Sequence, residues 1–518
     1  MPGASNTLPA GWVHASLGEI TAQIVRQAPP LGNTSLPYID ISSIDRDRKE
    51  IVDPQSIEPA SAPTRARQWV APGDVLVSMT RPNLNAVAIV SEALDGAVAS
   101  TGFDVLRTIG VNPRWVYYRV RTDEFVADLC NAIQGVVYPA VRPANIRAHE
   151  LPIPPLPEQR RIVAALDSHF SRLDAAVAAL ARVQRTLARY RASVLHAAVT
   201  GRLVPTEAEL ARTERREYEP ASVLLARILD ERRRRWEEAE LAKMIAAGKA
   251  PKDDRWKARY VAPVGPATEE LEELPEGWCW ATVGQLSRGL RSGSSAVPAD
   301  APTAFPILRS SSIRPGMVDL ENVRYLDHMS DERNFLNDGN LVFTRLSGSL
   351  EYVGNCAVVR GTLGRQIVYP DRVFCAHAMR IDIAEYIELC FETPLARKRI
   401  ASMAMSTAGH QRVSMGAITY QPIPLPPLPE LKRIRCETDR LTSTASETDF
   451  VTRRSAARLT RLRQSILRLA FEGRLVPQDP ADEPAAALLA RIRDERAARG
   501  SGPGRRQRRG VVGQERLM

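Results

Sequence analysis

The sequence lacks the residue patterns of a metal site, a disulfide framework or a membrane span. None of its six cysteines forms a C-x-x-C pair, and its seven histidines show no metal-ligand spacing. It has no run of about 18 apolar residues, the length that crosses a bilayer. Residues 1–12 lack the basic and apolar segments of a signal peptide. We therefore expect a protein of the reducing cytoplasm, with no bound metal and no membrane contact.

Motifs of enzymes that act on nucleotides or DNA are also missing. There is no P-loop for a nucleotide, and no Asn-Pro-Pro-Tyr-like or Asp-Pro-Pro-Tyr-like tetrapeptide of an amino-methyltransferase. Asp74 lies in an apolar stretch, but the Glu-x-Lys that a nuclease would add is not nearby. We expect no catalytic residue in this chain.

The charge of the chain suggests an acidic partner without locating its binding surface. The net charge of the 518 residues is +10, and nucleic acid is the commonest partner of a basic protein. Residues 453–518 hold sixteen arginines and seven acidic residues, so nearly all of the excess lies in the last eighth of the chain. The hydrophobic fraction of 44% is sufficient for well-packed cores.

The strongest pattern is an internal duplication. Blocks of the first half recur in the same order in the second half, displaced by 266 residues early in the repeat, by 272 later and by 264 in the last block. A repeat this long indicates tandem domains and not a solenoid. The matched blocks are residues 8–12 and 274–278, 15–19 and 281–285, 73–77 and 339–343, 155–158 and 427–430, 201–205 and 473–477, and 224–228 and 488–492.

Each repeat begins with a globular part and continues as a long helix. Short apolar runs between Pro, Gly and Ser turns predict short strands. A proline run then ends at Pro157, and no Pro or Gly occurs from Gln159 to Thr200, before Gly201. About 40 helical residues make a rod of roughly 60 Å.

Apolar residues at heptad spacing on both helices predict a coiled coil. The second helix has a polar middle at Ala445, Thr448, Thr452 and Ser455. We therefore expect tight packing at its ends and weak packing at its centre. The predicted core residues are Ile162, Leu166, Leu173, Leu180, Val183, Leu187, Tyr190, Val194, Ile434, Leu441, Leu459, Leu462, Ile466 and Leu469.

These patterns predict an α+β protein with two globular domains of short strands, tandemly duplicated and separated by two long helices that form an antiparallel coiled coil. The predicted parts are a first globular domain (1–157), a long helix (158–205), an accessory helix with a polar linker (206–273), a second globular domain (274–429), a second long helix (430–477), and a short helix with a basic, disordered tail (478–518).

Two matched loops in each repeat offer side chains suited to DNA. Arginine can donate two hydrogen bonds to guanine, asparagine can pair with adenine, and serine suits phosphate. A solvated turn is an equally good interpretation for any single residue of the first loop. For the second loop we favour contact, because both copies keep the layout while the side chains differ. For Arg309, a strand end with turn serines is the better interpretation. The candidates are Arg81, Asn83, Asn85, Arg345 and Ser347 in the first loop, Tyr138, Arg142, His410, Gln411 and Arg412 in the second, and Arg309 in a third.

The Leu-Pro-x-Gly-Trp openings, the proline-rich segments entering the long helices and the Gly-Arg-Leu-Val-Pro closures resemble Type I restriction-modification specificity subunits. The resemblance implies two target recognition domains with helical spacers that bind double-stranded DNA. It also implies two methyltransferase subunits and motor-nuclease restriction subunits as partners. Adenine methylation with S-adenosylmethionine and ATP- and Mg-dependent cleavage would then belong to those partners, and this chain would bind no cofactor.

Two other functions remain open from the sequence. A fused nuclease or methyltransferase would need a catalytic motif. A protein-interaction scaffold would show no salt-sensitive DNA binding, whereas phosphate contacts make affinity fall steeply with salt. If the chain reads two half-sites, rods of this length exceed the ~34 Å of one DNA turn and can set their spacing.

Overall fold

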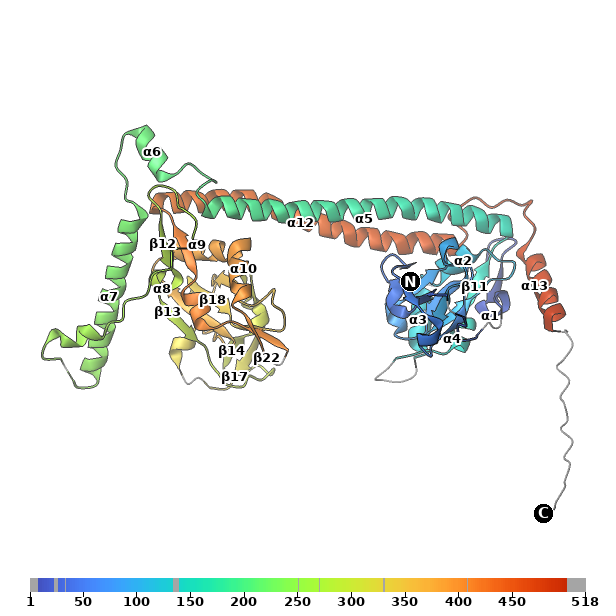
Figure 1. The fold of residues 1–518 in the computed structure, drawn as a ribbon, viewed down its shortest axis with the longest axis horizontal. Helices are drawn as coiled ribbons and strands as arrows, with labels where there is room; N and C mark the ends of the chain where they lie inside the picture. The colour runs from blue at the N-terminus through green and yellow to red at the C-terminus, as the bar shows by residue number, and fades with distance from the viewer. Residues whose placement is uncertain are drawn as a thin grey trace, which may run out of the picture. The chain divides into compact units, whose positions relative to one another are not determined.

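The computed structural model describes residues 8–22, 27–32, 34–133, 139–249, 251–269, 271–328, 331–407 and 409–500 (Figure 1). The chain divides into two compact units, each with a strand-rich domain. Unit 1 comprises Met1–Ala181 with Arg453–Met518, and unit 2 comprises Arg182–Thr452. The predicted disordered tail beyond residue 500 lies outside the described residues.

In the domain of unit 1, the first and the last segments of the domain pair with each other. β1 (Val13–Ser16) pairs antiparallel with β11 (Glu150–Ile153), so the first and last strands of the domain are neighbours. A second sheet has the order β10-β7-β8, a third has β5-β2-β9-β6, and β3 and β4 form a hairpin. These strands are β2 (Leu36–Ile39), β3 (Ile44–Asp45), β4 (Glu50–Ile51), β5 (Gln55–Ile57), β6 (Ala66–Trp69), β7 (Val75–Ser78), β8 (Val87–Ile89), β9 (Val98–Ser100) and β10 (Phe103–Leu106). The helices are α1 (Leu17–Ile20), α2 (Pro113–Arg119), α3 (Asp123–Asn131) and α4 (Pro143–Arg147).

The domain of unit 2 has the same plan, but its central sheet has four strands where that of unit 1 has three. β12 (Cys279–Thr282) pairs with β24 (Pro422–Leu425), as β1 does with β11. The central sheet has the order β13-β21-β18-β20, and three smaller sheets are β14-β17, β15-β16 and β19-β23-β22. Their bounds are β13 (Ser287–Ser292), β14 (Phe305–Leu308), β15 (Ile313–Arg314), β16 (Met317–Val318), β17 (Val323–Leu326), β18 (Asn340–Thr344), β19 (Leu346–Ser347), β20 (Cys356–Val358), β21 (Val373–Ala378), β22 (Met405–Thr407) and β23 (His410–Arg412). The helices are α8 (Val283–Leu286), α9 (Ile381–Glu392), α10 (Pro394–Ser402) and α11 (Met415–Thr419).

Two continuous helices of 44 residues, α5 (Leu156–Val199) and α12 (Leu428–Phe471), are each divided between the units. In unit 1 the beginning of α5 shares a core with the end of α12, where Leu166 and Phe170 cluster with Leu467. In unit 2 the end of α5 and the beginning of α12 share the other core, through Leu195 and Ile434. The helices therefore run antiparallel in each unit, and the predicted α+β fold with two long antiparallel helices is confirmed.

The helix seam departs from the heptad prediction at two positions of α5 and one of α12. Ile162, Leu166, Leu173, Val194, Ile434 and Ile466 are buried. Leu180, Leu187, Leu441, Leu459 and Leu469 are half-buried. Val183, Tyr190 and Leu462 are instead 40%, 41% and 45% exposed, so placing them in the core was wrong.

In unit 2 this part of α12 is rich in small polar residues, and it presents Ser446 to Arg191, the residue after Tyr190 in α5. Thr452 is buried, and its hydroxyl is satisfied by donating to the Thr448 carbonyl of its own helix at 2.7 Å.

The repeated blocks make the same junction twice. At the end of α12, a Cβ on Gly473 would lie 2.5 Å from Pro9 Cγ, and at the end of α5 a Cβ on Gly201 would lie 2.5 Å from Pro275 Cγ. Both glycines have a φ of +67°. Only glycine fits this positive φ and close approach, which explains why each helix ends in the same block.

A buried tryptophan–glutamate pair completes each junction. Trp12 Nε1 donates to Glu158 at 3.0 Å in unit 1, and Trp278 Nε1 donates to Glu430 at 3.0 Å in unit 2. Burial raises the pKa of both carboxyls. The proline-run glutamate thus connects the opening block of each domain to the first turn of its helix.

The end of each long helix leads into a further helix in the same unit. α6 (Glu207–Glu214) and α7 (Ala221–Ala246) follow α5, and α13 (Ala485–Gly500) follows α12. Ala221 N donates to Gly277 O at 2.7 Å, and Ala485 N donates to Gly11 O at 2.9 Å. Among the described residues, no helix combines the length and apolar character needed to cross a membrane.

Candidate nucleic-acid interface

The two loops predicted from the sequence lie side by side in unit 1. Thr80 forms a bridge with Ala140. Arg81 N donates to Pro139 O at 2.8 Å, and Val141 N donates to Met79 O at 2.9 Å. The backbone therefore holds residues 79–85, called the reader loop below, against the start of α4.

The equivalent loops of unit 2 pair in the same register. Leu346 pairs with Arg412, and Ser347 with Gln411, in the β19-β23-β22 sheet. Leu346 is displaced by 266 residues from Thr80, and Arg412 by 272 from Ala140, so both bridges obey the offsets of the duplication. The duplication has therefore preserved this loop pairing together with the cores.

The reader loop of unit 1 has a constrained backbone. Arg81 and Asn85 have φ of +47° and +44° and flank the one-turn helix η3 (Pro82–Leu84). Left-handed backbone is costly for residues with a Cβ and is concentrated at functional sites. Arg81 and Asn83 are exposed, and Asn85 is half-buried. Arg142 is exposed at the start of α4. Tyr138 lies outside the described residues.

In unit 2 the candidates differ in their exposure to solvent. His410 and Arg412 are exposed on β23, and Gln411 and Ser347 are half-buried between strands. Gln411 Nε2 donates to Ser406 Oγ at 3.3 Å.

Two arginines of unit 2 are engaged within the protein. Arg345 donates to the Asp371 carbonyl at 3.1 Å and lies over the Phe374 ring at 5.5 Å. Arg309 forms an ion pair with Asp300 at 3.1 Å. It precedes η6 (Ser310–Ser312), which contacts β19, so the third candidate loop joins the same surface.

A lysine that the sequence analysis did not single out supports the reader loop of unit 1. Lys49, at the tip of the β3–β4 hairpin, donates from Nζ to Asn85 O at 2.6 Å. Its own carbonyl accepts a hydrogen bond from Tyr117 Oη at 2.9 Å. Burial lowers the pKa of Lys49 to about 8, and Arg121 contributes. The charged run of residues 45–50 between two isoleucines was the only sequence signal for it.

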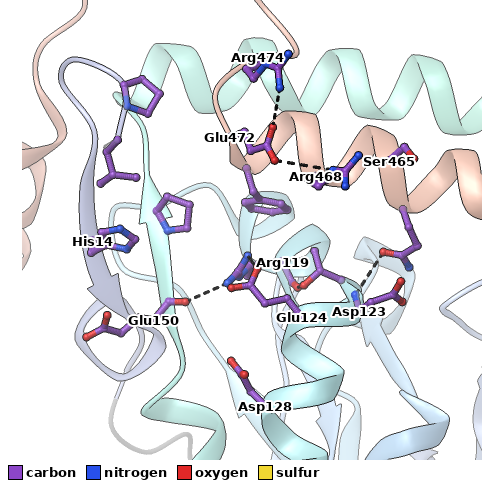
Figure 2. Close-up of a pocket in the computed structure, with 16 residues that line it drawn as sticks. His14, Arg119, Asp123, Glu124, Asp128, Glu150, Ser465, Arg468, Glu472 and Arg474 are labelled. Atoms are coloured by element: carbon purple, nitrogen blue, oxygen red, sulfur yellow. Dashed lines mark hydrogen bonds and ion pairs between the residues drawn. The ribbon is translucent and has the colours of Figure 1, made fainter. Parts of the chain in front are cut away.

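A cleft of about 1000 Å³ in unit 1 lies between α3, the β1–β11 pair and the end of α12 (Figure 2). Arg119 is buried beside it and forms an ion pair with Glu124 at 2.7 Å. Its Nε also donates to His149 Nε2 at 3.0 Å, and burial lowers the pKa of His149. The corresponding cavity of unit 2 measures about 90 Å³ and is lined by Trp280, in the place of His14. The charged groups of the larger cleft therefore connect structural elements to one another.

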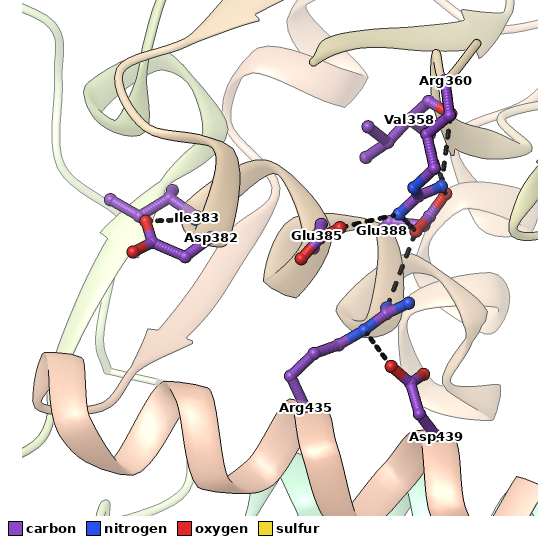
Figure 3. Close-up of polar contacts among 8 residues, drawn as sticks. All are labelled: Val358, Arg360, Asp382, Ile383, Glu385, Glu388, Arg435 and Asp439. Atoms are coloured by element: carbon purple, nitrogen blue, oxygen red, sulfur yellow. Dashed lines mark hydrogen bonds and ion pairs between the residues drawn. The ribbon is translucent and has the colours of Figure 1, made fainter. Parts of the chain in front are cut away.

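A polar network holds the domain of unit 2 to its own helix (Figure 3). The buried Glu388 carboxylate of α9 accepts from Val358 N at 2.7 Å and from Arg360 at 2.8 Å. Arg435 of α12 lies 3.7 Å from the same carboxylate and also pairs with Asp439 at 2.9 Å.

In unit 1, Asp167 of α5, which corresponds to Asp439, pairs with Arg114 of α2 at 2.7 Å and accepts a hydrogen bond from Tyr118 Oη. Each domain is thus fastened to its own helix by polar contacts. Among the residues that the structure describes, no three His, Cys, Asp or Glu side chains are grouped to hold a metal ion.

Two strand-rich domains with the same paired loops, each fastened to a long helix, define a duplicated recognition scaffold. Residues 12–180 match the family of Type I restriction modification DNA specificity domains. The resemblance seen in the sequence blocks is therefore confirmed, and the chain is similar to Type I restriction enzyme specificity subunits.

The similarity to specificity subunits extends along nearly the whole chain. The EcoKI specificity subunit of Escherichia coli (strain K12) is 26% identical and covers 96% of this chain and 98% of its own length. The EcoAI specificity subunit of Escherichia coli is 27% identical over 60% of this chain and 55% of its own length. A chain from a solved structure of the type I R-M system superposes with a TM-score of 0.60 and 22% identity, covering 90% of this chain and 99% of that chain. The solved structure supports the fold.

Proposed function

We propose that this chain is the sequence-specific DNA-binding subunit of a Type I restriction-modification complex, in which each unit reads one half of a bipartite target. The observation that carries the proposal is the pair of loops that meets in the same register in both units while its side chains differ. One backbone plan with two sets of side chains is what two half-sites of unlike sequence require.

The exposed side chains of each loop pair suit base edges. Arg81 and Asn83 in unit 1 can pair with guanine and adenine through two hydrogen bonds each. Arg412 offers the same chemistry to guanine in unit 2. Arg345 and Arg309, engaged with Asp371 and Asp300, would have to exchange those partners before contacting DNA.

The chemistry of the complex would belong to its partners. Two methyltransferase subunits using S-adenosylmethionine, and restriction subunits using ATP and Mg, would act on DNA that this non-catalytic chain selects. Asp74, the carboxylate that a nuclease could have used, is 1% exposed and forms an ion pair with Arg107 at 2.7 Å. Its carboxylate also accepts from Ala71 N at 2.9 Å, so it stabilises the fold.

A matched set of variants tests whether each unit reads one half-site. Arg81→Gln in unit 1 and Arg412→Gln in unit 2 are compared in the complete complex, using duplexes in which each base pair of the target is replaced in turn. Each variant should relax preference at one half-site only, by about 5- to 100-fold at the contacted base pair. Arg65→Gln, an exposed arginine outside the loop pair, is the control and should change no base preference.

Binding that is insensitive to salt would contradict the proposal and favour a scaffold that does not read DNA, because phosphate contacts impose a steep salt dependence. Equal loss at every base pair in both halves for either variant would also contradict the assignment of one unit to one half-site.

A further inference from the structure

We propose that Lys49 is a positioning residue that holds the reader loop of unit 1 in its base-reading conformation, and so sets the base preference of one half-site. The inference rests on the proposed function and adds a residue that is not itself placed to read a base.

Lys49 is held by two hydrogen bonds, one made by its side chain and one by its backbone carbonyl. Nζ donates to Asn85 O at 2.6 Å, at the exit of the reader loop, and the Lys49 carbonyl accepts from Tyr117 Oη on α2 at 2.9 Å. Tyr117 is 5% exposed and belongs to the main core of unit 1. Lys49 therefore links the loop to the rigid part of the domain.

The backbone conformations at this link are uncommon ones. Lys49, Arg81 and Asn85 have φ of +61°, +47° and +44°. Lys49 and Asn85, the two residues that this hydrogen bond joins, both have left-handed backbone, and Arg81 has it at the start of the same loop. Such conformations persist only where surrounding contacts hold them, and the lysine ammonium on the Asn85 carbonyl is such a contact.

The ammonium is also placed at an energetic cost. A charge that is partly removed from solvent is usually paired with an opposite charge, but the half-buried Lys49 bonds to a neutral carbonyl, with Arg121 among its neighbours. Asp45 and Asp47 offset this only in part, and the pKa of Lys49 falls to about 8, chiefly through burial. A half-buried ammonium on a neutral carbonyl beside the reader loop therefore supports a functional role for Lys49.

Unit 2 holds its loop without a lysine. Its corresponding hairpin, β15–β16, is joined by only Pro315 and Gly316, where the hairpin of unit 1 has four residues. The loop of unit 2 is held by backbone pairing in the β19-β23-β22 sheet, as the loop of unit 1 is by its bridge to Ala140, and Pro315 and Gly316 offer no ammonium group. Loss of the ammonium should therefore affect one half-site and leave the other unchanged.

The test uses the full chain in complex with its methyltransferase partner, first establishing the target of the wild type. Lys49→Met keeps the aliphatic stem and removes the donor. It should relax discrimination by about tenfold at base pairs of one half-site, within the range of a lost base contact, and change the other half-site less than twofold. Tyr117→Phe, which frees the Lys49 carbonyl, should cause a smaller relaxation at the same base pairs.

Arg48→Gln is the matched control, because it removes one positive charge from the same hairpin at a side chain that is 69% exposed. It should leave discrimination unchanged. Equal relaxation in Arg48→Gln, relaxation at both half-sites, or no change in Lys49→Met and Tyr117→Phe would each overturn the inference. A wild-type complex without a bipartite target would instead overturn the proposed function, and Lys49 with it.

Discussion

Replacing Glu392 by glutamine should stabilise α9 of unit 2 at alkaline pH. Burial raises the pKa of the Glu392 carboxyl to about 7. Glu388 and Asp439 add to this rise, whereas Arg435 and Arg191 oppose it. The fold therefore prefers the neutral acid.

The sign and size of the effect follow from proton linkage. Because the folded-state pKa lies above the ordinary value of 4.5, folded protein retains a proton that the unfolded chain has released. The contribution of Glu392 to stability is greatest below pH 4.5 and falls as pH rises to about 7. The gap between the two pKa values corresponds to about 3 kcal/mol as an upper bound. Glutamine cannot ionise, so the variant should gain roughly 2–3 kcal/mol over wild type at pH 8, and little at pH 5.

Hydrogen exchange of the α9 amides in the full chain, at pH 5 and pH 8, measures this local stability directly. Glu388→Gln, one turn earlier in the helix, should have the opposite effect on the stability of α9. It removes the carboxylate that binds Arg360 and should weaken α9 by about 1–3 kcal/mol at both pH values. Lower protection of Glu392→Gln at pH 8, or equal gains at both pH values, would refute the reasoning.

Three further predictions concern the junctions and the helices. Trp278→Phe should destabilise unit 2 by about 1–3 kcal/mol in urea unfolding, because the buried Glu430 carboxylate loses a donor; an unchanged midpoint would contradict this role. Gly473→Ala should cost about 1–3 kcal/mol more than Gly96→Ala, because both have positive φ but only Gly473 has a neighbour within 4 Å; equal costs would show that the close approach does not matter. Inserting four residues in frame near the middle of α5 should change the spacer between methylated half-sites, and unchanged spacing would refute a ruler role for the helix.

Much of this architecture could be predicted from the duplicated blocks. Proline and glycine punctuation placed the first helix between Gln159 and Thr200, and the structure has it at Leu156–Val199. Local chemistry is sufficient there, because proline and glycine act on their own backbone. The two candidate loops were also identified correctly as matched features, since their positions follow the repeat.

The remaining features depend on contacts between distant residues. The pairing of Thr80 with Ala140 and the bond from Lys49 to Asn85 cannot be derived from spacing. The heptad rule assigned Tyr190 to the core because it considers one helix at a time, whereas α12 supplies small polar residues in that region. The junction blocks were visible as repeats, but their roles required the three-dimensional structure.

The central claim, that each unit reads one half of a split DNA target, is tested most directly by single-molecule methylome sequencing. A host carrying this chain with the proposed methyltransferase partner is compared with the same host lacking this chain, and with one carrying Arg81→Gln. The account predicts a split motif with methyladenine in both halves, lost on deletion and relaxed in one half only by the substitution. A methylation pattern that does not depend on this chain would contradict the account.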